Sequence, residues 1–253
     1  MIKLVSHDAM DLINFLKAYG RVLPTPLIIF DRFGIYISDT DENLDINGEI
    51  YLSSSYFEEY NVEGEKDIKL NLEFLKDVSV HSEDKVEIEL KNLQIYFKII
   101  GNSTAREYNQ KIKSIGPIKD IISRAPVIRY ENYIVADYDV IANSIRSFRG
   151  VSETLKITFE KDRVILEGDG EGDDLRIELT SRFGGVRGIS YGEECTTAIY
   201  VLKHLLDALN VFENSKTPTL ALFVKDTYPL KLEGMFKNRF NRVRFYLQPL
   251  FVD

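Results

Sequence analysis

The chain has 253 residues, of which 44% are hydrophobic and 28% charged, a composition typical of a globular protein large enough for two domains. The net charge is −8, and residues 1–120 carry 14 Lys and Arg against 21 Asp and Glu, which argues against a generally basic, nucleic-acid-binding surface. No apolar run approaches the ~20 residues of a membrane span, no signal-peptide pattern is present, and the single cysteine, Cys195, excludes an internal disulfide. We therefore expect a cytoplasmic protein without a membrane segment.

The first half begins with a short helical pattern whose apolar face consists of Leu12, Leu16 and Tyr19. Two apolar runs separated by Asp31-Arg32-Phe33 follow, and they predict a pair of strands over Leu27–Ser38. A second short helix is expected at Asn71–Val78, and the alternation of apolar and charged residues over Val86–Ile100 predicts further strands.

The second half repeats this order. The apolar helix face recurs 129 residues later as Ile141, Ile145 and Phe148. A strand pair over Leu155–Gly168, a helix over Val201–Asn210 and a strand-rich tail over Thr219–Leu247 then follow. An internal repeat of this length indicates that one supersecondary plan is used twice.

Between the halves, residues 111–128 contain Gly116, Pro117 and Pro126 and show no clear period, which is typical of a connector. The sequence therefore predicts an N-terminal domain over residues 1–114, a connector over 115–128 and a C-terminal domain over 129–253.

Several segments resemble one known family. They are Phe30–Ile35, similar to a "DGI" hairpin; Tyr56–Glu65 followed by Ile68–Leu75; and the endings Tyr228–Glu233 and Phe245–Pro249, similar to "PLKLE" and "YLAP". Their order within a two-fold repeat resembles the archaeal sliding clamps of the proliferating cell nuclear antigen (PCNA) type.

The resemblance implies an α+β fold of two similar βα clamp domains, with outer sheets and short inner helices, and three subunits joined head to tail around duplex DNA. It implies a non-enzymatic processivity factor in DNA replication and repair in an archaeal cell, without metal or cofactor. The implied partners are double-stranded DNA, bound without sequence specificity, other clamp subunits in a homo- or heterotrimer, and a DNA polymerase, clamp loader, nuclease and ligase that bind through PIP-type peptides.

The resemblance also assigns basic side chains on the helices to the DNA. The expected DNA-facing residues are Lys17, Arg21, Lys76, Arg146, Arg149 and Lys203. Clamps of this type often carry Lys or Arg at four positions where this chain has Asp77, Val80, Ala142 and Asn210. We therefore expect the central hole of the ring to be lined by a less positive surface than is usual for the family.

The resemblance places a pocket for partner peptides beneath the connector. The matching residues are Leu44, Ile46, Ile118, Ile121, Ile122, Pro229, Tyr246, Leu247 and Pro249. An apolar groove of this kind is a common peptide-docking site. Thr40, Asn47 and Gln248 depart from the family pattern around it, which predicts an altered preference among client peptides.

The subunit interface is expected between an edge strand near Leu175–Thr180 and an edge strand of a neighbour within Ala105–Ser114. The residues assigned to this contact are Leu175, Ile177, Leu179, Tyr108 and Ile112. Pairing would satisfy backbone N–H and C=O groups that an edge strand otherwise leaves to solvent.

Two features of the sequence are compatible with other interpretations. The acidic run Glu167–Asp174 lacks the EF-hand spacing and its closing Glu, so it predicts a hairpin turn and no metal site. A basic cluster of Lys237, Arg239, Arg242 and Arg244 is either a solvated strand edge or a secondary contact for DNA or a partner. An enzyme with dispersed catalytic groups, or a β-rich structural module, is the alternative to a clamp, although no nucleophile motif or cluster of His and Cys supports it.

Overall fold

The structure is a computed structural model, and it describes residues 2–114, 128–170, 174–192 and 195–250. These residues form a mixed α+β fold of antiparallel sheets and a few short helices, which confirms the predicted fold class. They divide into two compact units. Unit 1 comprises Met1–Thr40, Glu49–Pro126 and Lys237–Arg242, and unit 2 comprises Asp41–Gly48, Val127–Phe236 and Val243–Asp253. Apart from residue 128, the predicted connector lies outside the described residues.

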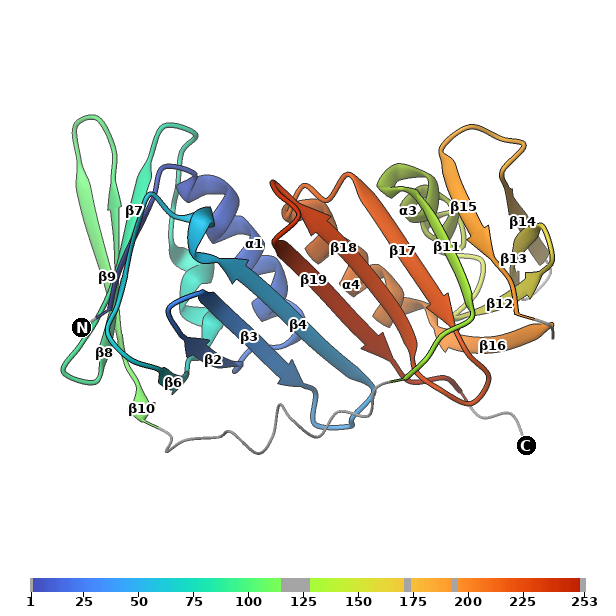
Figure 1. The fold of residues 1–253 in the computed structure, drawn as a ribbon, viewed down its shortest axis with the longest axis horizontal. Coiled ribbons are helices and arrows are strands. Elements are labelled where there is room, and N and C mark those ends of the chain that lie inside the picture. The colour runs from blue at the N-terminus through green and yellow to red at the C-terminus, as the bar shows by residue number, and fades with distance from the viewer. Residues whose placement is uncertain (1, 115–127, 171–173, 193–194, 251–253) are drawn as a thin grey trace. The chain divides into compact units, whose positions relative to one another are not determined.

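The first half of the chain contains ten strands, one α-helix and two 3₁₀ helices within its described residues (Figure 1). In chain order they are β1 (Ile2–Ser6), α1 (Ala9–Val22), β2 (Leu27–Phe30), β3 (Gly34–Thr40), β4 (Ile46–Ser53), η1 (Ser54–Tyr56), β5 (Glu59–Val62), β6 (Lys66–Lys69), η2 (Leu72–Asp77), β7 (Lys85–Lys91), β8 (Gln94–Ile100), β9 (Ala105–Lys111) and β10 (Lys113–Ser114). One sheet has the order β5-β1-β7-β8-β9, and β10-β6-β2-β3-β4 are successive neighbours in another.

The second half follows the same plan, with a 13-residue α-helix where the first half has the six-residue η2. Its elements are β11 (Asn132–Asp137), α3 (Tyr138–Arg146), β12 (Thr154–Glu160), β13 (Arg163–Asp169), β14 (Asp174–Thr180), β15 (Val186–Ser190), β16 (Thr196–Val201), α4 (Leu202–Asn214), β17 (Thr219–Val224), β18 (Leu230–Phe236) and β19 (Asn241–Leu247). One sheet has the order β14-β13-β12-β16, and β19-β18-β17-β11-β15 are successive neighbours in another. In both halves a strand, an α-helix and further strands are followed by a second helix, η2 or α4, and then by the last strands of that half.

The second helix of the first half differs from the prediction. The sequence predicts an ordinary helix over Asn71–Val78, but this segment forms the six-residue 3₁₀ helix η2. Its start is capped by the Asn71 Oδ1, which accepts a hydrogen bond of 2.9 Å from the backbone N–H of Glu73. At its end, the Val78 N–H donates to the Leu75 carbonyl, three residues back. Six residues allow few bonds of the i to i+4 type, so the tighter helix is favoured here.

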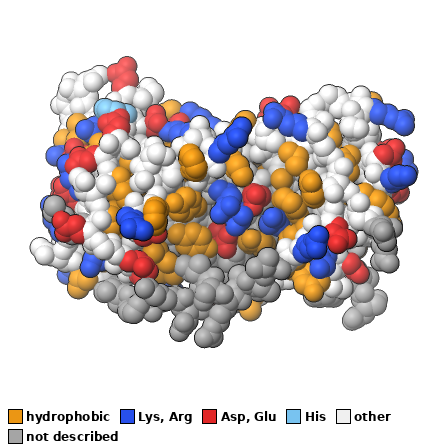
Figure 2. Space-filling view, in the orientation of Figure 1, with side chains coloured by type: hydrophobic (Ala, Val, Ile, Leu, Met, Phe, Trp, Pro, Cys, Tyr) orange, Lys and Arg blue, Asp and Glu red, His pale blue; other side chains and the backbone are white. Residues whose placement is uncertain are grey.

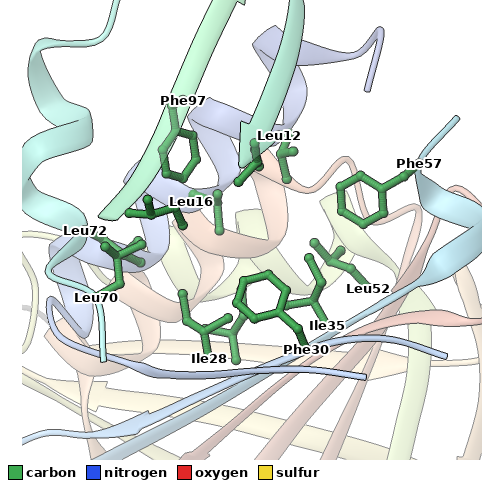
Figure 3. A pocket seen from close by; sticks show the side chains of 13 residues that line it. Leu12, Leu16, Ile28, Phe30, Ile35, Leu52, Phe57, Leu70, Leu72 and Phe97 are labelled. Atoms are coloured by element: carbon green, nitrogen blue, oxygen red, sulfur yellow. The ribbon is translucent and has the colours of Figure 1, made fainter. Parts of the chain in front are cut away.

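The predicted apolar helix faces lie in the cores. Leu12, Leu16 and Tyr19 of α1 are all buried, and so are Ile141 and Ile145 of α3. A cavity of about 30 Å³ lies beside α1 in the core of unit 1 (Figure 3). Its lining is entirely apolar, and it consists of Leu12, Leu16, Ile28, Phe30, Ile35, Ile37, Leu52, Phe57, Leu70, Leu72, Ile88, Ile95 and Phe97. Each helix thus packs one face against sheet side chains and leaves the other face polar.

Candidate nucleic-acid interface

Helix α1 has a single polar face. Asp11, Asn14, Lys17 and Arg21 follow one another at intervals of three or four residues, so they lie on one side of the helix. Nearly all the other residues between Ala9 and Gly20 are buried. The sequence therefore leaves this helix with two basic side chains, one acid and one amide on its exposed surface.

Lys17 is held by the end of η2. Its Nζ donates a hydrogen bond of 2.6 Å to the carbonyl oxygen of Val78, the residue that follows η2. Burial lowers the pKa of the Lys17 ammonium, and the nearby positive charge of Arg21 lowers it further. The hydrogen bond to Val78 fixes the position of the Lys17 ammonium and uses one of its three N–H donors. Arg21 is exposed and makes no ion pair within the described part of the chain.

The 3₁₀ helix η2 places carboxylates on both sides of its one basic side chain. Lys76 is exposed, as are Glu73 and Asp77. With Asp11, Lys17 and Arg21 of α1, the polar surface of these two helices carries three basic and three acidic residues. The formal charge of the helix surface in unit 1 is therefore zero.

In unit 2, Arg146 of α3 is fixed by α4. Its guanidinium donates a hydrogen bond of 2.5 Å to Glu213 Oε2 and one of 3.0 Å to the hydroxyl of Tyr138. That hydroxyl in turn donates to the Leu209 carbonyl at 3.0 Å. Burial raises the pKa of Tyr138 to about 12, partly offset by Arg146, so the phenol stays protonated at neutral pH. Arg146 thus has its charge compensated by a carboxylate on the neighbouring helix.

The other basic residues of unit 2 differ in their surroundings. Lys203 forms an ion pair of 2.7 Å with Asp207, one turn later on α4. Arg149, just beyond α3, is exposed and forms no ion pair with any described residue. The helix surface of unit 2 carries three basic residues, Arg146, Arg149 and Lys203, and three acidic ones, Asp139, Asp207 and Glu213. Its formal charge is therefore also zero, with His204 counted as neutral.

The six predicted DNA-facing residues thus fall into two groups. Lys17, Arg146 and Lys203 are bound to groups of the chain itself, whereas Arg21, Lys76 and Arg149 form no ion pair among the described residues. The Lys203–Asp207 pair is predictable from its spacing of four residues. The Arg146–Glu213 pair is not, because the two residues are 67 positions apart and meet only through the packing of α3 on α4.

Two strands stand at the ends of their sheets. β9 is the last strand of the sheet β5-β1-β7-β8-β9, and β14 is the first of the sheet β14-β13-β12-β16. The sequence-predicted interface residues lie here. On β14, Leu175 and Ile177 are half-buried and Leu179 is buried; on β9, Tyr108 is half-buried, and Ile112 is buried just after the strand ends.

The outer faces of these two sheets carry rows of alternating charge. In one, Lys156 of β12, Glu167 of β13 and Arg176 of β14 lie opposite one another, with ion pairs of 3.0 and 2.7 Å. In the other, Glu87 of β7 lies opposite Lys98 of β8, 3.8 Å away, and Lys98 lies opposite Glu107 of β9. The first row therefore ends in a cation at its edge, and the second in an anion.

Among the described residues, no group of three or more His, Cys, Asp and Glu side chains is arranged to hold a metal ion. Every helix in this part of the chain is too short or too polar to span a membrane. On the side seen in Figure 2, basic, acidic and hydrophobic side chains are interspersed.

No protein-family model matches the chain. It is 21% identical over 247 residues to a DNA polymerase sliding clamp of Pyrococcus horikoshii, covering 98% of this chain and 97% of that protein. It is 25% identical over 240 residues to DNA polymerase sliding clamp 1 of Sulfolobus acidocaldarius, and the match covers 92% of this chain and 93% of that protein. The chain is therefore similar, over nearly its whole length, to archaeal DNA polymerase sliding clamps.

Solved structures show that the chain has the fold of PCNA. PCNA from Thermococcus kodakaraensis superposes with a TM-score of 0.87 at 16% identity, covering 99% of this chain and all of that one. A chain of the PCNA2–PCNA3 complex of Sulfolobus tokodaii superposes with a TM-score of 0.83 at 19% identity. The match covers 98% of this chain and 98% of that one. The fold that the resemblance implied is therefore confirmed.

The peptide pocket that the sequence predicts lies only partly within the described residues. Leu44 is 67% exposed, and the loop that carries it is joined to the C-terminal segment, because the Gln248 N–H donates a 2.9 Å hydrogen bond to the Asp45 carbonyl. Ile46, Leu247 and Pro249 are buried, while Pro229 and Tyr246 are half-buried. The remaining predicted residues, Ile118, Ile121 and Ile122, lie outside the described residues.

An aromatic group next to Pro229 is not foreseen from the sequence. The Tyr130 hydroxyl donates a 2.7 Å hydrogen bond to the Pro229 carbonyl, and its ring lies 5.8 Å from that of Phe223. The ammonium of Lys231 lies 3.7 Å from the centre of the Phe223 ring, a cation–π contact. Alternation along β17 and β18 indicates that these side chains share a face of the sheet, but their proximity to Pro229 depends on the fold.

Proposed function

We propose that this chain is a subunit of a DNA sliding clamp, a three-subunit ring that encircles duplex DNA and keeps a polymerase and other replication and repair enzymes on their template. The observation that carries the proposal is similarity to DNA polymerase sliding clamps over 98% of the chain and 97% of the relative. A two-fold repeat of sheets and helices, with β9 in one half and β14 in the other at the end of a sheet, supports the ring form.

The contact with DNA is proposed to be weak and independent of sequence. A closed ring is retained by its topology, so its side chains need only contact phosphates. Arg21, Lys76 and Arg149 are the cations available for this, since they form no ion pair in the described part of the chain. Lys17, Arg146 and Lys203 are a second group, whose side chains are already bonded within the chain: Lys17 to a backbone carbonyl, and Arg146 and Lys203 to carboxylates that offset their charge.

The ring is proposed to close by addition of β14 of one subunit to β9 of the next, a head-to-tail contact. Antiparallel pairing over the full seven residues of each strand sets Asp174 opposite Lys111 and Ile177 opposite Tyr108. Asp174 and Lys111 form no ion pair within the described residues, so both are available for a partner. The same register sets Glu178 opposite Glu107, a like-charge pair, so Asp174 and Lys111 form its one directly opposed pair of opposite charges. A different clamp subunit with a cation in the place of Glu107 would remove this repulsion.

Client enzymes are proposed to dock short PIP-type peptides against the predicted pocket, with Leu44, Pro229 and Tyr246 offering the accessible surface. These clients would be the polymerase, the clamp loader, a nuclease and a ligase. The half-buried rings around Pro229 are suitable for apolar anchors, because an apolar groove accepts the aliphatic and aromatic side chains of such a peptide.

A topological assay tests the ring directly. Light scattering should give a mass about three times that of the 29.2 kDa chain, alone or after mixing with the organism's other clamp subunits. A cognate clamp loader should place the ring on a nicked circular plasmid, where it should resist high salt, and it should be released when the plasmid is linearised. Equal release from circular and linear DNA, or no assembly in any mixture, would show that the chain does not act as a clamp.

A further inference from the structure

Two loops of unit 1 carry exposed phenylalanine side chains next to arginine. Phe33, between β2 and β3, is 58% exposed and follows Arg32, while Phe240, before β19, is 68% exposed and follows Arg239. A ring with more than half its surface in water gains little from the fold. We refer to these four residues, together with Arg242, as the arginine–phenylalanine patch.

The two loops are attached to the same short segment. The Ser54 N–H donates a 2.7 Å hydrogen bond to the Phe33 carbonyl. The adjacent Ser53 N–H donates one of 2.9 Å to Oδ1 of Asn241, the residue after Phe240. Ser53 and Asn241 are both buried, and the hydroxyl of Tyr51 donates a further bond of 3.1 Å to the Phe33 carbonyl. The two exposed rings therefore project from a common, rigid base.

The charge of the patch differs from that of the rest of the chain. Arg32, Arg239 and Arg242 form no ion pair with any described residue, although the chain as a whole has a net charge of −8. The nearby Lys237 is paired with Asp8 and lies over the ring of Tyr56, so it is not counted. The guanidinium of Arg32 lies 4.5 Å from the centre of the Phe33 ring. Three uncompensated guanidinium groups and two flat rings thus share one surface.

We propose that the arginine–phenylalanine patch binds single-stranded nucleic acid, with bases stacking on Phe33 and Phe240 and phosphates contacting the three arginines. Exposed aromatic rings beside basic side chains are the usual means of binding single strands without regard to sequence. A duplex fits less well, since its bases are already stacked. An acidic peptide also fits less well, because the rings stand on loop tips and offer neither a groove nor a strand edge.

Binding at the patch does not depend on assembly of the three-subunit clamp. The proposed clamp function would bring the protein to primed DNA, but the binding chemistry of the patch belongs to one unit of one chain. Failure of the patch and failure of the clamp function therefore have different signatures, namely oligonucleotide affinity in one case and retention on circular DNA in the other.

Fluorescence anisotropy with a labelled oligothymidine tests the patch. The double variant Phe33→Ala, Phe240→Ala should weaken binding by about tenfold or more. The variant Arg32→Gln, Arg239→Gln should reduce the slope of log affinity against log salt by roughly 0.7 for each phosphate that an arginine no longer binds. A matched control is Arg182→Gln with Phe183→Ala in unit 2, where Phe183 is 66% exposed and also follows an arginine, and it should leave affinity unchanged.

Three outcomes would overturn the proposal. The first is wild-type protein that binds a duplex of equal length as well as it binds the oligothymidine. The second is a control variant that weakens binding as much as the patch variants do. The third is polyglutamate that competes as well as unlabelled oligothymidine, which would indicate a protein partner. The four side chains that the patch variants replace are exposed residues of unit 1. Their substitution should therefore weaken binding without a change in melting temperature or oligomer mass.

Discussion

At the scale of single residues, the charge of the proposed DNA surface is set by pairs within the chain. Arg146 is the clearest case, since it is bound to Glu213 and to the Tyr138 hydroxyl, which itself is anchored on the Leu209 carbonyl. A partly exposed ion pair of this kind contributes little to stability, of order 0–1 kcal/mol. Its larger effect is on availability, because the cation must exchange one anion for another.

We predict that Glu213→Gln increases affinity for duplex DNA. Removing the carboxylate frees Arg146 for phosphate, so the slope of log affinity against log salt should become steeper by about 0.9, the value for one added contact. Filter binding or anisotropy across a salt series would measure it. Glu153→Gln, at an exposed position in unit 2 that forms no ion pair with a described residue, removes the same charge and should leave the slope unchanged. Equal effects of the two variants would point to net charge rather than release of Arg146.

Gly34 shows a different residue-scale constraint, one of space. A Cβ on this residue would lie 2.2 Å from the Leu52 carbonyl oxygen and 3.0 Å from the Ser53 Cα, both of them backbone atoms that cannot rotate away. We predict that Gly34→Ala destabilises the protein by about 1–3 kcal/mol or more, as overpacking does. Gly184→Ala, with no described atom within 4 Å of the added Cβ, is the matched control. Urea unfolding of both variants would measure this difference in stability. Equal urea midpoints for the two variants would show that β3 and β4 can move apart at little cost in free energy.

Sequence reasoning worked best where one residue's role is set by its own helix or strand. The apolar faces of Leu12, Leu16 and Tyr19 and of Ile141 and Ile145 followed from helical period alone, and all five side chains are buried. The positions of basic residues on the helices were also readable. Their partners were not, because Val78 and Glu213 reach Lys17 and Arg146 only through tertiary packing.

At the scale of elements, the repeat predicted the order of strands and helices but not the type of every helix. η2 and α4 occupy corresponding places, and Leu72, Leu75 and Asp77 correspond to Leu202, Leu205 and Asp207. Yet η2 ends after six residues, whereas α4 runs from Leu202 to Asn214. Val78 follows η2 in an extended conformation, and no apolar stripe continues beyond it, so the helix has no further face to bury.

The two edge strands give an element-scale prediction about assembly. In the proposed register, Asp174 of β14 faces Lys111 of β9, and a directly opposed pair of opposite charges contributes about 0.2–1 kcal/mol. Asp174→Lys should create repulsion and raise the dissociation constant of the assembly on the order of fivefold or more. Lys111→Asp alone should do the same. The double variant should recover most of the affinity.

Sedimentation velocity over a dilution series would measure these constants. Lys161→Asp, on the exposed turn between β12 and β13, is a charge-reversal control that should not change them. If each single variant weakens assembly and the double variant does not restore it, the strands pair in another register. If neither single variant has any effect, these strands are not the interface.

At the scale of the whole molecule, the net charge of −8 coexists with two helix surfaces of formal charge zero and an arginine–phenylalanine patch that is positive. The excess of acid therefore lies away from the helices, on the sheets and loops. A neutral inner surface would let a ring slide with small electrostatic barriers, since few counterions are released on contact. Retention would then depend on closure of the ring rather than on affinity.

This leads to a prediction in which affinity and retention separate. The double variant Asp77→Asn, Asp207→Asn removes one acid from the helix surface of each unit and releases Lys203 from its ion pair. Affinity of the unloaded protein for linear duplex should rise, and the salt slope should steepen by about one to two units. Retention on a closed circle at high salt should not change, because β9 and β14, the strands proposed to close the ring, are not altered. Glu42→Gln with Asp162→Asn, at exposed positions away from the helices, is the control for net charge. Faster release from closed circles, or an unchanged salt slope, would mean that these helix surfaces do not face the DNA.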